Sequence, residues 1–320
     1  CTGKTLICSY LFLFLQKYFL KLLETHIVPK SNSSVRIQEY DVANFECIAT
    51  KSALKKSIKK QLITINEKMA TTAMYVSEND IIKVYAEETI IKKIFKLTIS
   101  VIFEDDAIAI INKPAGFPTN GNYFKTIENA LPHNLKSATG MDALAYPKPV
   151  HRLDNPTSGI LIIAKTKSAQ RDLYHQFEQQ QITKIYQAIV IGKTIDKGEI
   201  TSAVAEKEAF TKYKTIQTVS SLQNEHLSLV ELFPTTGRTH QLRIHLASIN
   251  HPIIGDQLYG KKEENYKKGL FLCATSIQFT HPKTKEKVSF TINPPNKYKS
   301  LLDREERRYI KFNHTAKYDN

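Results

Sequence analysis

The sequence predicts an α+β protein in which a small α+β domain precedes a larger, strand-rich domain with some helices. Its 320 residues suffice for one large domain or two unequal ones. A lysine-rich stretch of helical periodicity lies near residue 55, and from Leu97 onward many short strand-like runs alternate with turns. The predicted organisation is an N-terminal extension at 1–34, a small domain at 35–88, a large domain at 97–300 and a basic tail at 301–320.

The charge balance favours a polyanionic partner. There are 45 Lys and Arg residues against 31 Asp and Glu residues, which gives a net charge of +14. RNA, DNA or an anionic membrane surface would complement this charge, and charge alone does not choose among them. The four cysteines form no CxxC pair and no His/Cys cluster at metal-ligand spacing, so we expect neither a metal site nor a disulfide framework. A reducing cytoplasm fits best.

An apolar run near the N-terminus could imitate an export signal. Residues 6–15 read LICSYLFLFL, but Gln16 and Lys17 interrupt the run well short of the about 20 residues that span a membrane. No small-residue cleavage pattern follows, and we therefore expect no membrane partner. The sequence begins with Cys and its first methionine is Met69. This pattern fits an N-terminal stretch that is over-translated upstream sequence.

A compact basic unit follows the polar break at 31–34. Its centre is a predicted helix in KSALKKSIKKQL, where Leu54 and Ile58 belong to an apolar stripe. Short strands are expected at 62–66 and 81–85, each beside a turn. The lysines of the helix recur at spacings of four and five: Lys51, Lys55, Lys56, Lys59 and Lys60.

This order of elements resembles the small RNA-binding domain named after ribosomal protein S4. The segments VRIQEY, the basic helix, LITIN-EK and SENDIIKVY carry the resemblance. It implies that Lys51, Lys55 and Lys59 bind substrate RNA. The first long loop, ANFECIAT, lacks the basic residues that are often found there. The alternative is a solvated lysine-rich helix on an unrelated small domain.

The large domain alternates strands, turns and helices. A hairpin is predicted to lead into KPAG, and GILIIA has the composition of a buried strand. Ser168 is predicted to cap the helix that contains Leu173 and Phe177. A further helix is expected in HQLRIHLASI. The predicted strands are 101–103, 107–112, 159–164, 184–190 and 227–233.

Four segments in order are similar to the RluA family of RNA pseudouridine synthases. They are KPAG from Lys113, HRLDNPTSGILIIAKT from His151, KIYQAIVIG around Tyr186, and TGRTHQLRIHLASINHPIIGDQLYG from Thr236; a late FTHP also matches. Cys273 departs from the family, because many members carry histidine there. The resemblance implies a catalytic domain built on a mixed or antiparallel sheet, with RNA in a cleft and no cofactor. It also implies the conversion of uridine to pseudouridine.

The resemblance implies that Asp154 is the catalytic carboxylate. The reaction breaks the bond from ribose C1′ to a base nitrogen and remakes it to a base carbon, so it resembles a glycosidase step without water. Asp154 can attack the sugar, stabilise positive charge that develops on it, or take part in elimination through a glycal. Arg243 of HQLR is the expected partner that fixes its orientation.

Other site residues follow from the same motifs. Tyr186 is implied to stack on the target base and to help move a proton. Arg152 is implied to enter the space left by the flipped nucleotide, because a planar guanidinium stacks on bases. Lys113, His151 and Arg238 are further candidates for binding substrate.

Each catalytic candidate also has a structural explanation. Asp154 could form only a turn before Asn155, and Tyr186 could point into an ordinary sheet face. Arg243 could belong to a structural ion pair, which would require an acid beside it. Asp256 has the sequence context of a turn residue.

The histidines His151, His240 and His245 lack an acidic ligand at metal spacing, so structural hydrogen bonding is also expected of them.

Two other function classes compete with an RNA-modifying enzyme. A non-catalytic RNA-binding or ribosome-assembly protein could share the scaffold, but it would not need Asp154, Tyr186 and Arg243 together. A glycosidic hydrolase would need two carboxylates, and one stands out. We expect a monomeric, cytoplasmic enzyme that acts on ribosomal RNA rather than transfer RNA, by family analogy.

Overall fold

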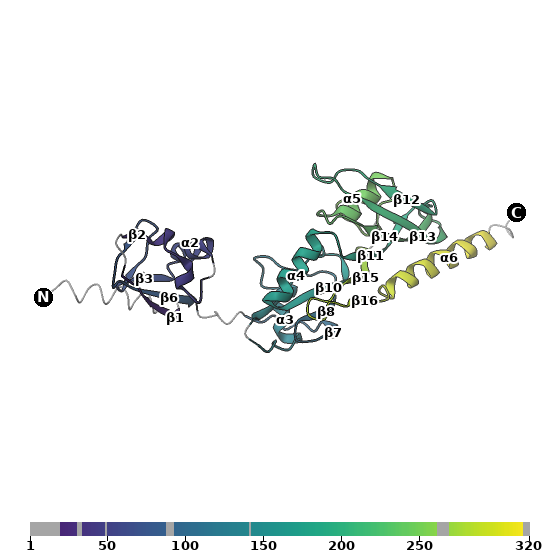
Figure 1. The fold of residues 1–320 in the computed structure, drawn as a ribbon. Coiled ribbons are helices and arrows are strands. Elements are labelled where there is room, and N and C mark those ends of the chain that lie inside the picture. Colours follow the sequence, from purple (N-terminus) through teal and green to yellow (C-terminus); the bar gives the residue numbers. More distant parts are fainter. Residues whose placement is uncertain are drawn as a thin grey trace. The chain divides into compact units, whose positions relative to one another are not determined.

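The computed structural model describes residues 20–30, 34–48, 50–87, 93–140, 142–260 and 269–315. The chain divides into two compact units, one up to Lys92 and one from Lys93 onward (Figure 1). The apolar run at 6–15 and residues 88–92, at the boundary between the two predicted domains, lie outside the described residues. Among the helices in these ranges, none is long and apolar enough to cross a membrane.

The small unit is a four-stranded antiparallel sheet with one helix beside it. The strand order is β1 (Leu20–Ile27), β6 (Ile81–Glu87), β3 (Ile63–Ile65) and β4 (Lys68–Met69). A two-stranded pair joins β2 (Val35–Arg36) to β5 (Tyr75–Val76), and single turns of 3-10 helix span Ile37–Glu39 and Val42–Asn44. The predicted strands at 62–66 and 81–85 are thus confirmed, with shifted ends.

The predicted basic helix is α2 (Lys51–Lys59). Thr50 begins it, because its hydroxyl accepts a hydrogen bond from the Ala53 amide at 3.1 Å. Leu54 and Ile58 are buried in the core of the small unit. The helix ends before Gln61, whose left-handed φ of 58° breaks the helical path.

The expected start of the small domain at Val35 is wrong. Strand β1 lies in the predicted N-terminal extension, yet it pairs with β6 along its whole length. His26 of β1 also makes a 2.8 Å hydrogen bond to the Tyr40 hydroxyl and packs edge-on against Phe45. Most side chains of β1 are exposed, so its sequence lacks the alternation of apolar and polar residues by which a strand is usually predicted.

The large unit is built on a ten-stranded sheet (Figure 1). Strands β10 and β15 run parallel and the other paired strands run antiparallel, which confirms a mixed sheet in an α+β fold. The main path is β12 (Lys197–Ile200), β13 (Thr211–Ser221), β14 (Glu225–Pro234), β11 (Thr183–Ile191), β15 (Leu272–Thr280), β10 (Ser158–Thr166), β8 (Ile108–Lys113) and β7 (Ser100–Glu104). In addition, β16 (Lys287–Thr291) pairs with β15 and β9 (Ala143–Pro149) pairs with β10.

Strands β8 and β10 are covered on both faces, which explains their continuous apolar sequences. On one face Ile111 and Ile163 pack with residues of α3 (Ile127–Asn134). On the other, Ile110 and Ile162 pack with residues of α4 (Lys167–Glu178). The centre of the sheet is thereby a rigid base for the loops at its strand ends.

The cap of α4 differs from the prediction. Thr166, not Ser168, accepts the hydrogen bond of the Ala169 amide, at 3.2 Å. Ser168 instead bonds through its amide and its hydroxyl to the Asp142 carboxylate. A threonine at the end of β10 can cap because its backbone is extended there.

Gly159 lets β10 and β15 approach at the centre of the sheet. Its φ is +117°, and a Cβ atom would overlap the backbone of Ala274. The parallel pairing joins Ser158 to Cys273 and Gly159 to Ala274, directly beyond the HRLD turn. A side chain at 159 would therefore displace the start of the strand that carries this turn.

The C-terminal segment is not the basic tail that the sequence suggested. It forms α6 (Lys297–Thr315), whose residues Tyr298, Leu301 and Leu302 are buried in the core formed around β11 and β14. The buried Glu305 accepts a 2.9 Å hydrogen bond from the Ser221 hydroxyl. The first half of α6 is thus part of the large unit.

Candidate active site

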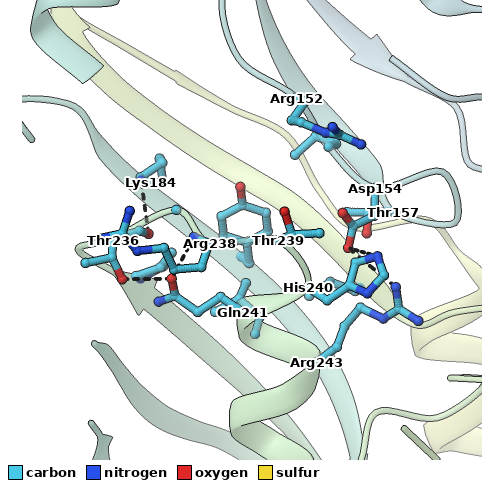
Figure 2. A pocket seen from close by; sticks show the side chains of 16 residues that line it. Arg152, Asp154, Thr157, Lys184, Thr236, Arg238, Thr239, His240, Gln241 and Arg243 are labelled. Atoms are coloured by element: carbon cyan, nitrogen blue, oxygen red, sulfur yellow. Dashed lines mark hydrogen bonds and ion pairs between the residues drawn. The ribbon is translucent and has the colours of Figure 1, made fainter. Parts of the chain in front are cut away.

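A cavity of about 110 Å³ opens at the ends of the central strands of the large unit (Figure 2). Its walls come from the HRLD turn before β10, from β11, from the loop after β14, and from the start of α5 (Gln241–Ser248). Asp154, Tyr186 and Arg243 all line it, together with Arg152 and Arg238. Folding therefore brings together the three residues that the sequence singled out as catalytic.

The backbone around Asp154 is held on both sides. The Thr157 amide donates to the Asp154 carbonyl at 3.0 Å, and the Gly116 amide donates to the Asn155 carbonyl at 2.9 Å. The Thr119 hydroxyl accepts from the Leu153 amide at 3.1 Å and donates to the Leu153 carbonyl at 2.9 Å. These bonds fix the turn, so the carboxylate is presented to the cavity in a preorganised position.

The ammonium of Lys113 holds this turn through hydrogen bonds to its carbonyl oxygens. Lys113 is fully buried, and its ammonium donates to the carbonyl oxygens of Thr157 at 2.8 Å and of Asp154 and Asn155 at 3.3 Å. A fourth bond reaches the Pro114 carbonyl at 3.1 Å. Lys113 does not line the cavity, so its predicted role in binding substrate is wrong, and it positions Asp154 instead.

Burial lowers the pKa of Lys113 to about 8, although the charge of Asp154 opposes this effect. In the unfolded chain the pKa is about 10.4, so between pH 8 and pH 10 the unfolded state binds more protons. The free energy of unfolding should therefore gain about 2 to 3 kcal/mol from this group as the pH rises through that range. Urea unfolding of the wild type and Lys113→Met across pH 7 to 10 should show a steeper rise in the wild type than in the variant. An identical pH slope in the two proteins would contradict it.

Arg243 lies between two carboxylates. Its Nε and Nη2 atoms donate to Asp256 at 2.7 and 2.8 Å, while Nη1 lies 3.5 Å from Asp154 Oδ2 (Figure 2). Burial alone would lower the pKa of Arg243, but the bonds to Asp256 and the charge of Asp154 raise it. The predicted contact between Arg243 and Asp154 is present, but the shorter hydrogen bonds of Arg243 go to Asp256.

Asp256 is more than the turn residue that its sequence context suggested. Its side chain is buried, and its Oδ1 also accepts the backbone amides of Leu258 and Tyr259 at 3.0 and 3.1 Å. Burial raises the pKa of Asp256, but the hydrogen bonds from Arg243 and these amides lower it overall. One indication of this contact was present in the sequence, because a buried Arg243 needs an acid beside it.

Tyr186 lies on β11 beside Asp154. Burial raises the pKa of its phenol well above the ordinary value, and the neighbouring Asp154 and Cys273 act in the same direction. The phenol is therefore neutral at physiological pH. It offers an aromatic face and a hydrogen-bond donor rather than a phenolate base.

The two other arginines of the cavity are exposed. Arg152 lies near the Asp154 turn, and Arg238 lies in the loop after β14 (Figure 2). Buried Gln241 holds this loop, because its Oε1 accepts the Arg238 amide at 3.0 Å and the Thr236 hydroxyl at 2.7 Å. Both guanidinium groups are accessible to an anionic ligand.

The histidines have separate positions. His151 does not line the cavity: its Nε2 accepts the Ile162 amide at 3.0 Å, and burial together with Lys184 lowers its pKa to about 3. Its expected role in binding substrate stays a prediction, and the observed hydrogen bond agrees with the structural alternative. His245 is buried and bonded to Thr211.

His240, by contrast, lines the cavity, with Nε2 3.8 Å from Asp154 Oδ2 and Nδ1 3.0 Å from the Tyr259 hydroxyl. Its functional position was not identified from the sequence. No group of three or more His, Cys, Asp or Glu side chains within the described residues could hold a metal ion.

Comparison with known proteins shows to which family this chain is similar. Residues 107–248 match the family model described as RNA pseudouridylate synthase. An RNA pseudouridine synthase of Aquifex aeolicus is 32% identical over 281 residues, covering 79% of this chain and 88% of that protein. Ribosomal large subunit pseudouridine synthase C of Haemophilus influenzae is 30% identical over 308 residues, covering 87% and 93%.

A solved structure supports the same fold. Human RNA Pseudouridylate Synthase Domain Containing 1 superposes with a TM-score of 0.53 at 23% identity, and the match covers 62% of this chain and 84% of that one. The large-unit fold that the motifs implied is thus confirmed. The chain belongs to the RluA family of RNA pseudouridine synthases, isomerases that act on RNA.

Proposed function

We propose that this synthase converts specific uridines of large-subunit ribosomal RNA to pseudouridine in the cytoplasm, with Asp154, Tyr186 and Arg243 as its catalytic residues. The observation that carries the proposal is a half-closed cavity in which Asp154, 17% exposed, faces a buried arginine at 3.5 Å. The names of the relatives from Haemophilus influenzae and Zymomonas mobilis, which specify the large ribosomal subunit, support the choice of RNA.

The proposed chemistry follows from these positions. A uridine must leave its base stack to reach Asp154, and exposed Arg152 at the mouth can occupy the space that it leaves. Asp154 then acts at ribose C1′ while the bond to the base nitrogen breaks. Tyr186 stacks on the detached uracil as it turns to present its carbon atom. Attack on the sugar and elimination through a glycal both require the carboxylate at this position.

The small unit is proposed to be the S4-like part of the enzyme and to bind RNA outside the cavity. Lys51, Lys55 and Lys59 of α2 lie about one turn apart and are all exposed, while Leu54 and Ile58 of the same helix are buried. Such a face can neutralise several RNA phosphates without reading their sequence. We further propose that the enzyme works as a monomer.

Replacing Lys55 and Lys59 together with Ala should weaken RNA binding. Each lost phosphate contact should lower the slope of log K against log salt concentration by about one. Fluorescence anisotropy with ribosomal RNA fragments from 50 to 300 mM salt would measure this slope. The matched control is Lys68→Ala on β4, which should keep the wild-type slope. An unchanged slope in the double variant would show that α2 does not touch RNA.

The proposed substrate is tested by mapping pseudouridines in total RNA from cells that contain or lack the protein. We expect one or a few sites in large-subunit ribosomal RNA to disappear with the protein. They should return when the wild type is restored. A loss confined to transfer RNA would overturn the choice of substrate, and no loss in any RNA would favour a non-catalytic binding role.

A further inference from the structure

A second hollow of about 450 Å³ lies beside the cavity of Asp154. The two share Lys184, Thr236, Gly237 and Arg238, so they are separated only by this wall. Figure 2 shows Lys184 and Arg238 on the side of the cavity opposite Asp154. The volume lies within the range of about 300 to 1,000 Å³ that is usual for ligand pockets.

Lys184 brings an uncompensated positive charge to this wall. Burial lowers its pKa, and in the described part of the chain no carboxylate forms an ion pair with it. Its ammonium makes one bond, at 3.4 Å, to the Thr236 carbonyl. Glu178 lines the hollow but is exposed to solvent, and the neighbouring His151 is neutral. A desolvated lysine with spare donors is stabilised by an anion.

The wall leaves the ammonium accessible. A Cβ atom on Gly237 would lie 4.0 Å from Lys184 Nζ, and the glycine has no positive φ that would require it for backbone reasons. The guanidinium of Arg238 is exposed on the same loop, with its Nε bonded to the Glu208 carbonyl at 3.1 Å. Two cations thus face the boundary between the hollows.

The far wall of the second hollow is apolar in part. Phe177 of α4 and Ile182 line it, and the Phe177 ring is held against His151 with centroids 4.9 Å apart. A held aromatic side chain next to a cationic wall is the combination that binds one nucleotide of a single strand, base and phosphate together.

We propose that the second hollow binds the nucleotide next to the target uridine, and that Lys184 and Arg238 hold the phosphate that links the two. The inference rests on the proposed function, because it requires a uridine in the cavity of Asp154. The shared wall is where the chain of a bound RNA passes from one hollow to the other. Lys184 then acts in binding and does not touch the reacting atoms.

The test uses the full chain and a synthetic RNA hairpin that carries a uridine mapped as its substrate. The phosphates on the 5′ and 3′ sides of that uridine are replaced, one at a time, by neutral methylphosphonate. For the wild type, one of the two replacements should weaken binding about tenfold. Lys184→Met should bind the unmodified hairpin about tenfold more weakly and should not respond further to that replacement.

Lys193→Met is the matched control, since Lys193 is exposed just beyond the opposite end of β11 and should behave as the wild type. Gly237→Val tests the site with Lys184 intact, because its side chain would cover the ammonium and should weaken binding in the same way. If Lys184→Met responds to both methylphosphonates as the wild type does, the subsite is wrong while the synthase stands. If the wild type makes no pseudouridine in any RNA, the proposed function fails and the subsite fails with it.

Discussion

Asp154→Asn is expected to abolish pseudouridine formation while RNA binding stays close to the wild-type level. The amide keeps the shape of the side chain, and the turn that holds it is fixed through backbone groups, so the cavity should be preserved. The variant lacks the charge that either chemical route requires at ribose C1′. Loss of an essential group of this kind lowers turnover by at least about a thousandfold. Single-turnover assays with saturating enzyme would measure it, and anisotropy would measure binding.

Asp196→Asn is the matched control, because Asp196 is an exposed carboxylate outside the cavity. It should bind and react as the wild type does. Product formation by Asp154→Asn near the wild-type rate would remove Asp154 from the chemistry. A joint loss of binding and turnover would instead assign it a structural role, as in the turn interpretation of the sequence.

Much of the lining of this cavity could be predicted from the sequence, because its residues lie in contiguous motifs. Asp154, Arg152 and their turn occupy one segment, and Arg243 occupies another. A strand that is apolar throughout, such as GILIIA, also predicted its own burial, which the cores on both faces of β10 confirm. The sequence pattern was therefore sufficient for features that a single segment of the chain determines.

The predictions failed where the partner of a residue is distant in sequence. From the sequence, Lys113 was predicted to bind substrate. In the fold, its ammonium donates to the carbonyl oxygens of a turn about 40 positions later in the chain. Asp256 resembles a turn residue until Arg243 is placed against it. Strand β1 is defined mainly by its pairing with β6, since its own side chains are half exposed. Such contacts depend on the fold and leave no local pattern.

Removing the Asp256 carboxylate should have a large effect on both stability and turnover. In Asp256→Ala the buried guanidinium of Arg243 loses bonds of 2.7 and 2.8 Å, and the amides of Leu258 and Tyr259 lose their acceptor. Leaving one partner of a buried ion pair alone costs about 3 to 5 kcal/mol. The freed guanidinium should also turn from its present geometry toward Asp154, so turnover should fall by at least about tenfold.

The double variant Asp256→Ala/Arg243→Met separates these two effects. It removes both buried charges, so it should regain much of the free energy of unfolding that Asp256→Ala loses, because an apolar replacement of a buried pair is often close to neutral. Turnover should stay low, since Asp154 then faces no cation. Urea unfolding and single-turnover assays on the wild type, both single variants and the double variant would complete the cycle. Recovery of turnover together with stability would show that Arg243 serves the fold alone, whereas stability without turnover assigns it to the chemistry at Asp154.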